Sequence, residues 1–91
     1  MSFEWDLRKA EANFKKHGVR FSEAISVFED DYAITIKDTE SDPNEERFVS
    51  MGLGAKGRVL VVVYSYRDTA IRLISARVAE PHERLLYEEM R

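Results

Sequence analysis

The sequence has 91 residues, a mass of 10.6 kDa and a formal net charge of −3, so we expect residues 1–91 to form a single small domain. Its 44% hydrophobic and 34% charged residues exclude a disordered tail. The longest apolar run (59–64) is far too short to span a bilayer, and the N-terminal residues lack a signal-peptide pattern. Without cysteine there is no disulfide, thiolate zinc site or cysteine nucleophile. We therefore expect a cytoplasmic protein with no membrane contact.

The charges are segregated along the chain. Residues 29–46 hold eight acidic side chains against one basic, whereas residues 47–77 hold six basic side chains against one acidic. Such segregation favours a locally positive surface on a protein whose total charge is negative.

The first predicted element is a helix over Leu7–His17. Asp6 is a suitable N-cap, Gly18 can supply the left-handed stop, and apolar residues recur between them at helical spacing. The opposite face carries polar residues at the same spacing: Lys9, Asn13, Lys16 and His17. This row is either a binding surface or the solvated face of an ordinary helix. His17 can also simply complement the helix dipole.

The rest of the chain predicts a second helix, four strands and a third helix. Ser22 is the expected N-cap of a short helix over 23–29. Apolar alternation predicts a strand at 32–37, and a valine-rich apolar run predicts the strongest strand at 58–66. Two further strands are predicted at 46–53 and 71–77, with a polar loop at 39–44 and tight turns at 54–57 and 67–69. Pro81 fits the first position of a helix over 82–90. The order ααββββα predicts an α+β fold: two N-terminal helices, a four-stranded antiparallel meander sheet and a C-terminal helix.

No phosphate loop, dinucleotide fingerprint or metal-ligand spacing occurs, so we expect no metal and no cofactor. Arginine, tyrosine and histidine side chains lie on and around the predicted sheet, and they are compatible with the few groups that metal-free RNA cleavage needs. The candidate cations are Arg47, Arg67, Arg72 and Arg77. The candidate proton carriers are His17, His82, Tyr64 and Glu83.

Strand parity limits these candidates. Arg72 and Arg77 stand five positions apart in one predicted strand, so we expect them on opposite faces, with at most one in a given site. Tyr64 and Tyr66 share a parity that is also typical of ordinary cross-strand packing. Glu83 lies four residues before Tyr87, and a local contact on the last helix explains that spacing equally well.

The sequence resembles the BrnT family of toxins over nearly its whole length. The resemblance rests on these residues in this order: Phe3, Trp5-Asp6, Lys9, Asn13, Lys16-His17-Gly18-Val19, Phe21, Glu23-Ala24, Glu46-Arg47, Gly52, Arg58, Leu60, Val62, Tyr64, Arg67, Arg72, Ile74-Ser75-Ala76-Arg77, Glu83 and Tyr87. The Lys-His-Gly-Val and Ile-Ser-Ala-Arg segments are the most specific of them.

The resemblance implies a RelE-like fold and the toxin of a bacterial type II toxin–antitoxin module. Such a toxin cleaves RNA, inhibits translation and arrests growth. Its implied partner is a DNA-binding antitoxin of the BrnA family, and operator DNA is met only through that complex. The implied catalytic residues are His17, Arg67, Arg77, Glu83 and Tyr87. The implied substrate-binding residues are Lys9, Asn13, Lys16 and Arg47. As a working hypothesis, His17 transfers a proton while Arg67 and Arg77 hold the phosphate.

Two functions therefore stay open at this point. One is a metal-independent endoribonuclease toxin. The other is a catalytically weak protein-binding module that acts as antitoxin partner and operon co-repressor. The acidic net charge favours the second, because phosphate contacts dominate affinity for RNA. The two differ in whether the isolated protein cuts RNA.

Overall fold

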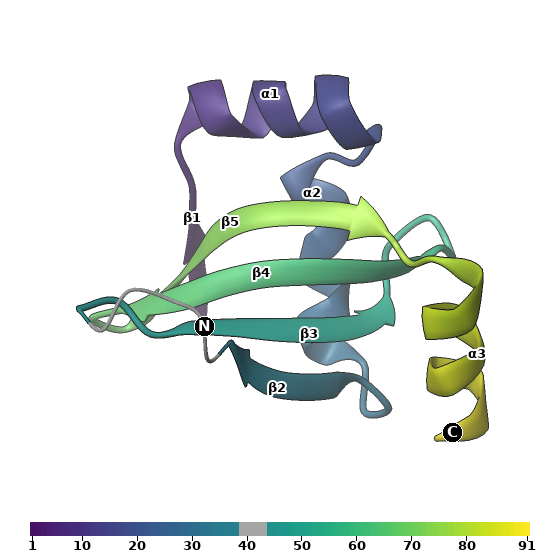
Figure 1. The fold of residues 1–91 in the computed structure, drawn as a ribbon. Helices are drawn as coiled ribbons and strands as arrows, with labels where there is room; N and C mark the ends of the chain where they lie inside the picture. The colour runs from purple at the N-terminus through teal and green to yellow at the C-terminus, as the bar shows by residue number, and fades with distance from the viewer. Residues whose placement is uncertain (39–43) are drawn as a thin grey trace.

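The computed structural model describes residues 1–38 and 44–91, so most of the predicted loop at 39–44 lies outside the described residues. The described chain forms a five-stranded mixed sheet in the order β1-β5-β4-β3-β2 (Figure 1). The strands are β1 (Ser2–Glu4), β2 (Ile34–Asp38), β3 (Arg47–Leu53), β4 (Val59–Arg67) and β5 (Ala70–Val78). The helices are α1 (Leu7–His17), α2 (Phe21–Ala24), the 3-10 helix η1 (Ile25–Glu29) and α3 (Pro81–Glu89).

The α+β class is confirmed, but the four-stranded antiparallel sheet is a correction. β2 to β5 do form the predicted antiparallel meander, and β1 adds a fifth strand parallel to β5, with Phe3 opposite Ile71. Three residues are too few to show an alternating pattern, so β1 carries no strand signal of its own. The pairing brings the start of α1 beside β5.

The helix predictions hold at both ends of the chain and fail in between. α1 has the predicted bounds, with Asp6 capping two backbone N–H groups and Gly18 at φ 69°. The predicted helix over 23–29 is wrong in its start: it begins at Phe21, and Ser22 makes no cap. The ring of Phe21 is buried in the core, so packing rather than capping sets this boundary. α3 begins at Pro81 as predicted, after a capping box between Glu80 and Glu83.

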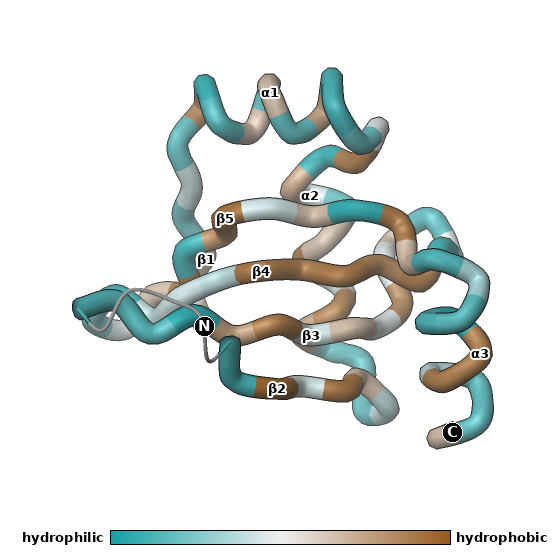
Figure 2. Tube along the Cα trace, viewed as in Figure 1, coloured by the Kyte–Doolittle hydropathy of each residue, from teal (hydrophilic) through white to brown (hydrophobic). Residues whose placement is uncertain are grey.

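The two faces of the sheet are covered unequally. α2 and η1 pack over one face, where Phe21 and Val27 meet Leu60 and Val62 in the main core. Figure 2 shows the hydrophobic middle of β4 that faces these layers. On the other face, α3 covers only one end, where Tyr87 packs against strand residues of β3 and β4. We call the remainder of that second face the open face. No helix of the described residues is long and apolar enough to cross a membrane.

An irregularity in β5 decides which side chains reach the open face. Val63 lies opposite Ser75, but the next residue of β4, Tyr64, lies opposite Leu73, so Ile74 is an extra residue in β5. Arg72 is thereby opposite Ser65, and Arg77 is opposite Val61. Positions 61 and 65 of β4 share a face, and so Arg72 and Arg77 share it too. The prediction that they face opposite sides is wrong because the bulge inverts the alternation.

Candidate functional site

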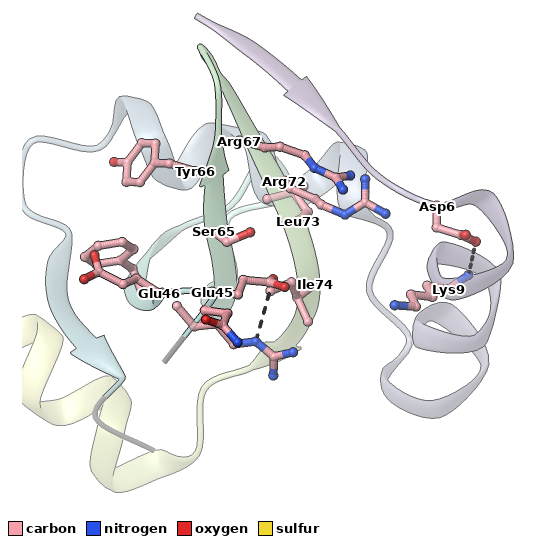
Figure 3. Close-up of a pocket in the computed structure, with 13 residues that line it drawn as sticks. Asp6, Lys9, Glu45, Glu46, Ser65, Tyr66, Arg67, Arg72, Leu73 and Ile74 are labelled. Carbon is pink, nitrogen blue, oxygen red and sulfur yellow. Dashed lines mark hydrogen bonds and ion pairs between the residues drawn. The ribbon is translucent and has the colours of Figure 1, made fainter. Parts of the chain in front are cut away.

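A polar cleft of about 650 Å³ lies at the end of the open face that is farthest from α3 (Figure 3). Its basic lining residues are Lys9, Arg47, Arg67 and Arg72, and its acidic ones are Asp6, Glu45 and Glu46. They come from the first turn of α1, the start of β3 and the hairpin end of β4 and β5. The structure therefore brings together three of the residues implied by the resemblance: Lys9, Arg47 and Arg67.

Strand register builds the floor of the cleft. Arg47, Ser65 and Arg72 stand directly opposite one another on β3, β4 and β5. Ser65 is buried and small, so it leaves room between the two arginine side chains. Arg67 ends β4 on the same face, and its guanidinium group points to the same side of the cleft as that of Arg72 (Figure 3).

The basic groups of the cleft differ in how far they are neutralised. Arg72 lies 3.7 Å from Glu4, and Arg47 lies 4.0 Å from Glu45. By contrast, within residues 1–38 and 44–91 the guanidinium of Arg67 and the ammonium of Lys9 make no hydrogen bond or ion pair. These two cations are therefore available to an anionic ligand.

The acidic side chains of the cleft are already engaged. Asp6 accepts hydrogen bonds from the backbone N–H groups of Arg8 and Lys9, which is its N-cap role. Glu46 pairs with Lys37 at 3.1 Å. The carboxylates therefore do little to satisfy Lys9 and Arg67.

Arg77 occupies the open face nearer to α3. Its Nη1 and Nη2 donate to the two carboxylate oxygens of Glu83 at 2.7 and 2.9 Å. This pair lowers the pKa of Glu83 to about 2 and raises the pKa of Arg77. Glu83 also accepts the backbone N–H of Glu80 at 2.8 Å, so its carboxylate is ionised and fixed at neutral pH. It can position Arg77, but it has no proton to donate.

Arg77 keeps two donors beyond this pair. A guanidinium group has five N–H donors, and Nη1 uses its second one on the carbonyl of Val78 at 3.4 Å. Nε–H and one Nη2–H remain, and together they form the side edge of the fork. Such an edge matches two oxygens of a phosphate group.

His17 and Lys16 lie at the far end of α1 from the cleft. α1 runs alongside β5 in the same direction (Figure 1): Lys9 reaches the cleft beside Ile74, and Asn13 bonds to Ala76. One further turn, about 6 Å along the helix, brings His17 to the level of Arg77. His17 thus lies outside the cleft, toward the other basic end of the open face.

Asn13 and Tyr87 are placed inside the protein. The Asn13 amide donates to the carbonyls of Val19 at 3.0 Å and Ala76 at 2.9 Å, and it accepts from Ala76 N–H at 3.1 Å. Tyr87 is buried under α3 and donates its hydroxyl to Asp30; burial, and then this bond, raise the pKa of Tyr87. We infer that both residues hold the framework together, Asn13 between α1 and β5 and Tyr87 between α3 and η1.

Sequence reasoning missed that Arg72 and Arg77 share a face, because no residue pattern predicts a bulge at Ile74. It also missed Ser65, a small buried residue whose importance comes only from its register. A Ser between two tyrosines near the end of a strongly apolar strand is the one signal that was available. Among the described residues, no group of three or more His, Asp or Glu side chains is arranged to hold a metal ion.

The fold and site define a class: small α+β proteins with a basic cleft on the open face of a sheet. Comparison with known proteins narrows the class. Residues 5–83 match the model of the family described as ribonuclease toxin, BrnT, of type II toxin-antitoxin system. The chain belongs to the BrnT family of type II ribonuclease toxins.

A solved structure supports the same assignment. The chain is similar to the Brucella abortus ribonuclease toxin BrnT, known from a 1.1 Å crystal structure, with 26% identity and a TM-score of 0.70. The match covers 88% of this chain and 97% of that one. No curated protein matches. Membership of a type II system implies an RNA substrate and an antitoxin partner.

Proposed function

We propose that this protein, acting as one toxin domain over residues 1–91, is a metal-independent endoribonuclease that cleaves RNA by attack of the ribose 2′-OH on the adjacent phosphate. The observation that carries the proposal is a pair of cations, Lys9 and Arg67, that have no partner among residues 1–38 and 44–91 and lie in a cleft shared with Arg47 and Arg72. Phosphate contacts dominate affinity for RNA. The local positive charge of the cleft supplies such contacts although the net charge of the whole chain is negative.

The reacting phosphate is best placed over the middle of β5. Arg72 and Arg77 are about 15 Å apart along the strand, so a phosphate above Ile74 and Ser75 is about half that distance from each. In this arrangement Arg72 and Arg77 stabilise the charge that develops on the phosphorane-like transition state, while Lys9, Arg47 and Arg67 bind flanking phosphates.

Proton transfer falls to His17 in this proposal. Of the two histidines, His82 lies at the start of α3 beside Glu80, while His17 ends the helix that runs along β5. A histidine side chain can act as a general base, so His17 can take the proton of the 2′-OH. Lys16 beside it adds a further contact to the RNA backbone. Glu83 acts as a positioning residue that fixes the Arg77 fork.

In the cell, we propose, the protein acts in the cytoplasm, inhibits translation by cutting RNA and is neutralised by a BrnA-like antitoxin. The complex then contacts operator DNA through the antitoxin. Growth arrest on induction, reversed by co-expression of the antitoxin, is the expected phenotype.

The test measures initial rates of cleavage of end-labelled RNA by the isolated protein, beside Arg67→Ala, His17→Ala and Lys56→Ala variants. Lys56 lies in the exposed turn between β3 and β4 and lines none of the cleft, so it is the charge-matched control. We expect a loss of about 100-fold or more for His17→Ala, a smaller loss for Arg67→Ala because one flanking phosphate contact is removed, and no change for Lys56→Ala. Equal rates of cleavage for all four proteins contradict the assigned site. Intact RNA, with ribosomes present as well, contradicts the catalysis and favours the binding module.

A further inference from the structure

A second hollow lies on the other side of the sheet end, behind Tyr66. It has a volume of about 300 Å³ and is lined by Thr35, Ser50, Tyr64 and Tyr66, with Phe28 and Ile71 at its base. Tyr66 lines both this hollow and the basic cleft, so the two are separated by one side chain. In Figure 3 the ring of Tyr66 points away from the guanidinium groups of Arg67 and Arg72.

The Tyr66 ring is exposed and yet held in place. It is 58% exposed, and it makes T-shaped contacts with Phe48 at 5.4 Å and Tyr64 at 5.9 Å between ring centroids. An aromatic ring that is held by neighbouring rings and largely open to solvent can stack on a flat ligand with little further loss of conformational freedom.

The chemistry of the hollow suits a nucleobase better than a phosphate. Besides Met1 and Asp30, its lining residues are apolar or carry hydroxyl groups, and the Asp30 carboxylate is already engaged by hydrogen bonds from Tyr87, Leu53 and Tyr32. Such a wall offers a phosphate no guanidinium group and no lysine ammonium. It tolerates a neutral ring that carries N–H groups.

Hydroxyl groups line the same hollow. Thr35 and Ser50 are 2.7 Å apart at their oxygens, and Ser50 and Tyr64 are 2.8 Å apart. Three hydroxyl groups joined by two hydrogen bonds leave one O–H proton unused. Because hydroxyl groups can rotate, this proton can be offered from different members of the row. The row can therefore meet either an acceptor or a donor on the edge of a base.

We propose that Tyr66 and this hollow form a base-binding subsite for the RNA substrate: a nucleobase stacks on Tyr66 while its own phosphate lies in the cleft at Arg67. Consecutive residues of a strand point to opposite faces, so Tyr66 and Arg67 hold the base and the phosphate on the two sides of the end of β4. Stacking of this kind accepts any base, with preference set by the hydroxyl row. The inference rests on the proposed function, since it names how the same RNA is held.

The test uses a short 2′-O-methyl oligonucleotide that contains 2-aminopurine, which cannot be cut by 2′-OH attack. Its fluorescence reports stacking and its titration reports affinity. We expect quenching with the wild-type protein and with Tyr66→Phe. Tyr66→Ala loses the quenching and binds about five- to a hundredfold more weakly. Its salt dependence stays that of the wild type, whereas Arg67→Ala has a shallower salt dependence.

Tyr32→Ala is the matched control, because Tyr32 is also an exposed tyrosine but lines neither hollow. Unchanged affinity and quenching in Tyr66→Ala overturn the subsite, and so does a wild-type protein that does not bind the oligonucleotide. Cleavage of RNA by a protein with no dependence on Tyr66 leaves the ribonuclease in place and removes only the subsite. If oligonucleotide binding depends on Tyr66 but the protein leaves RNA intact, the subsite is supported and the proposed catalysis is contradicted.

Discussion

Arg72 and Arg77 project from the same face of β5, although they are five residues apart in one strand. The extra residue Ile74 restores the alternation that five steps would break. One basic group therefore stands in the cleft and the other beside Glu83, with a stretch of open sheet between them. This relationship turns two separate arginines into the two ends of one basic surface.

If both arginines contact RNA phosphates, Arg72→Ala and Arg77→Ala each weaken RNA binding. Each also lowers the slope of log affinity against log salt by about 0.7–1, because one phosphate contact is lost. Titration of a non-cleavable oligonucleotide at several salt concentrations measures this slope. An effect confined to one of the two variants contradicts the shared surface.

Asn13 tests the distinction between framework and RNA contact. Asn13→Ala leaves buried backbone groups of Val19 and Ala76 without partners, so we expect a loss of about 2–4 kcal/mol in the free energy of unfolding. Lys9→Ala, one turn earlier on the exposed side of α1, should change it by less than about 0.5 kcal/mol. Chemical denaturation measures both. Wild-type stability with impaired RNA binding in Asn13→Ala would contradict the framework role and indicate that Asn13 contacts RNA.

The ion pair between Glu23 and Arg58 joins α2 to β4. Arg58 donates to both carboxylate oxygens, at 3.0 and 2.6 Å, and the Glu23 side chain is only 3% exposed against 37% for Arg58. Arg58→Ala therefore strands a buried charge and should cost about 3 kcal/mol of unfolding free energy. Glu23→Ala should cost less, because Arg58 regains water. A double-mutant cycle by urea denaturation checks this order. Equal losses of unfolding free energy in the two variants would contradict it.

Glu83 makes stability depend on acid pH. Its pKa is about 2 in the folded protein, chiefly through the hydrogen bonds from Arg77, against 4.5 unperturbed. A lowered folded-state pKa stabilises the protein above about pH 4.5, and this contribution disappears as the pH falls toward 2. We expect Glu83→Gln to be about 1–2 kcal/mol less stable than wild type at pH 7, with the difference vanishing near pH 2. A difference that is constant with pH contradicts the ion pair.

The fold was predictable where the signal is local and repeated. The helix over Leu7–His17 has a cap, a stop and an apolar stripe. The longer strands are marked by apolar alternation, as in β2, or by a continuous apolar run, as in β4. β1 is too short to carry such a pattern and is held by its pairing with β5. The start of α2 depends on burial of Phe21, which lies outside the reach of a capping rule.

The site was predictable as a set of residue types but not as an arrangement. Strand register and the parallel pairing of β1 bring together Lys9, Arg47 and Arg67. Neither feature can be predicted from a local sequence pattern. The polar spacing of α1 suggested one binding face, yet Asn13 from that row turns inward to satisfy Ala76. Helical spacing shows which residues share a face, and it does not show what that face meets.

The central claim is that RNA is cut by 2′-OH attack on this open face. It is tested most directly by the chemistry of the ends that the isolated protein leaves on RNA in the presence of EDTA. The account predicts 2′,3′-cyclic phosphate ends, formed by the wild-type protein and the Lys56→Ala control and at least about 100-fold more slowly by Arg77→Ala. Products with 3′-hydroxyl ends, a reaction abolished by the chelator, or undiminished cleavage by Arg77→Ala would contradict it.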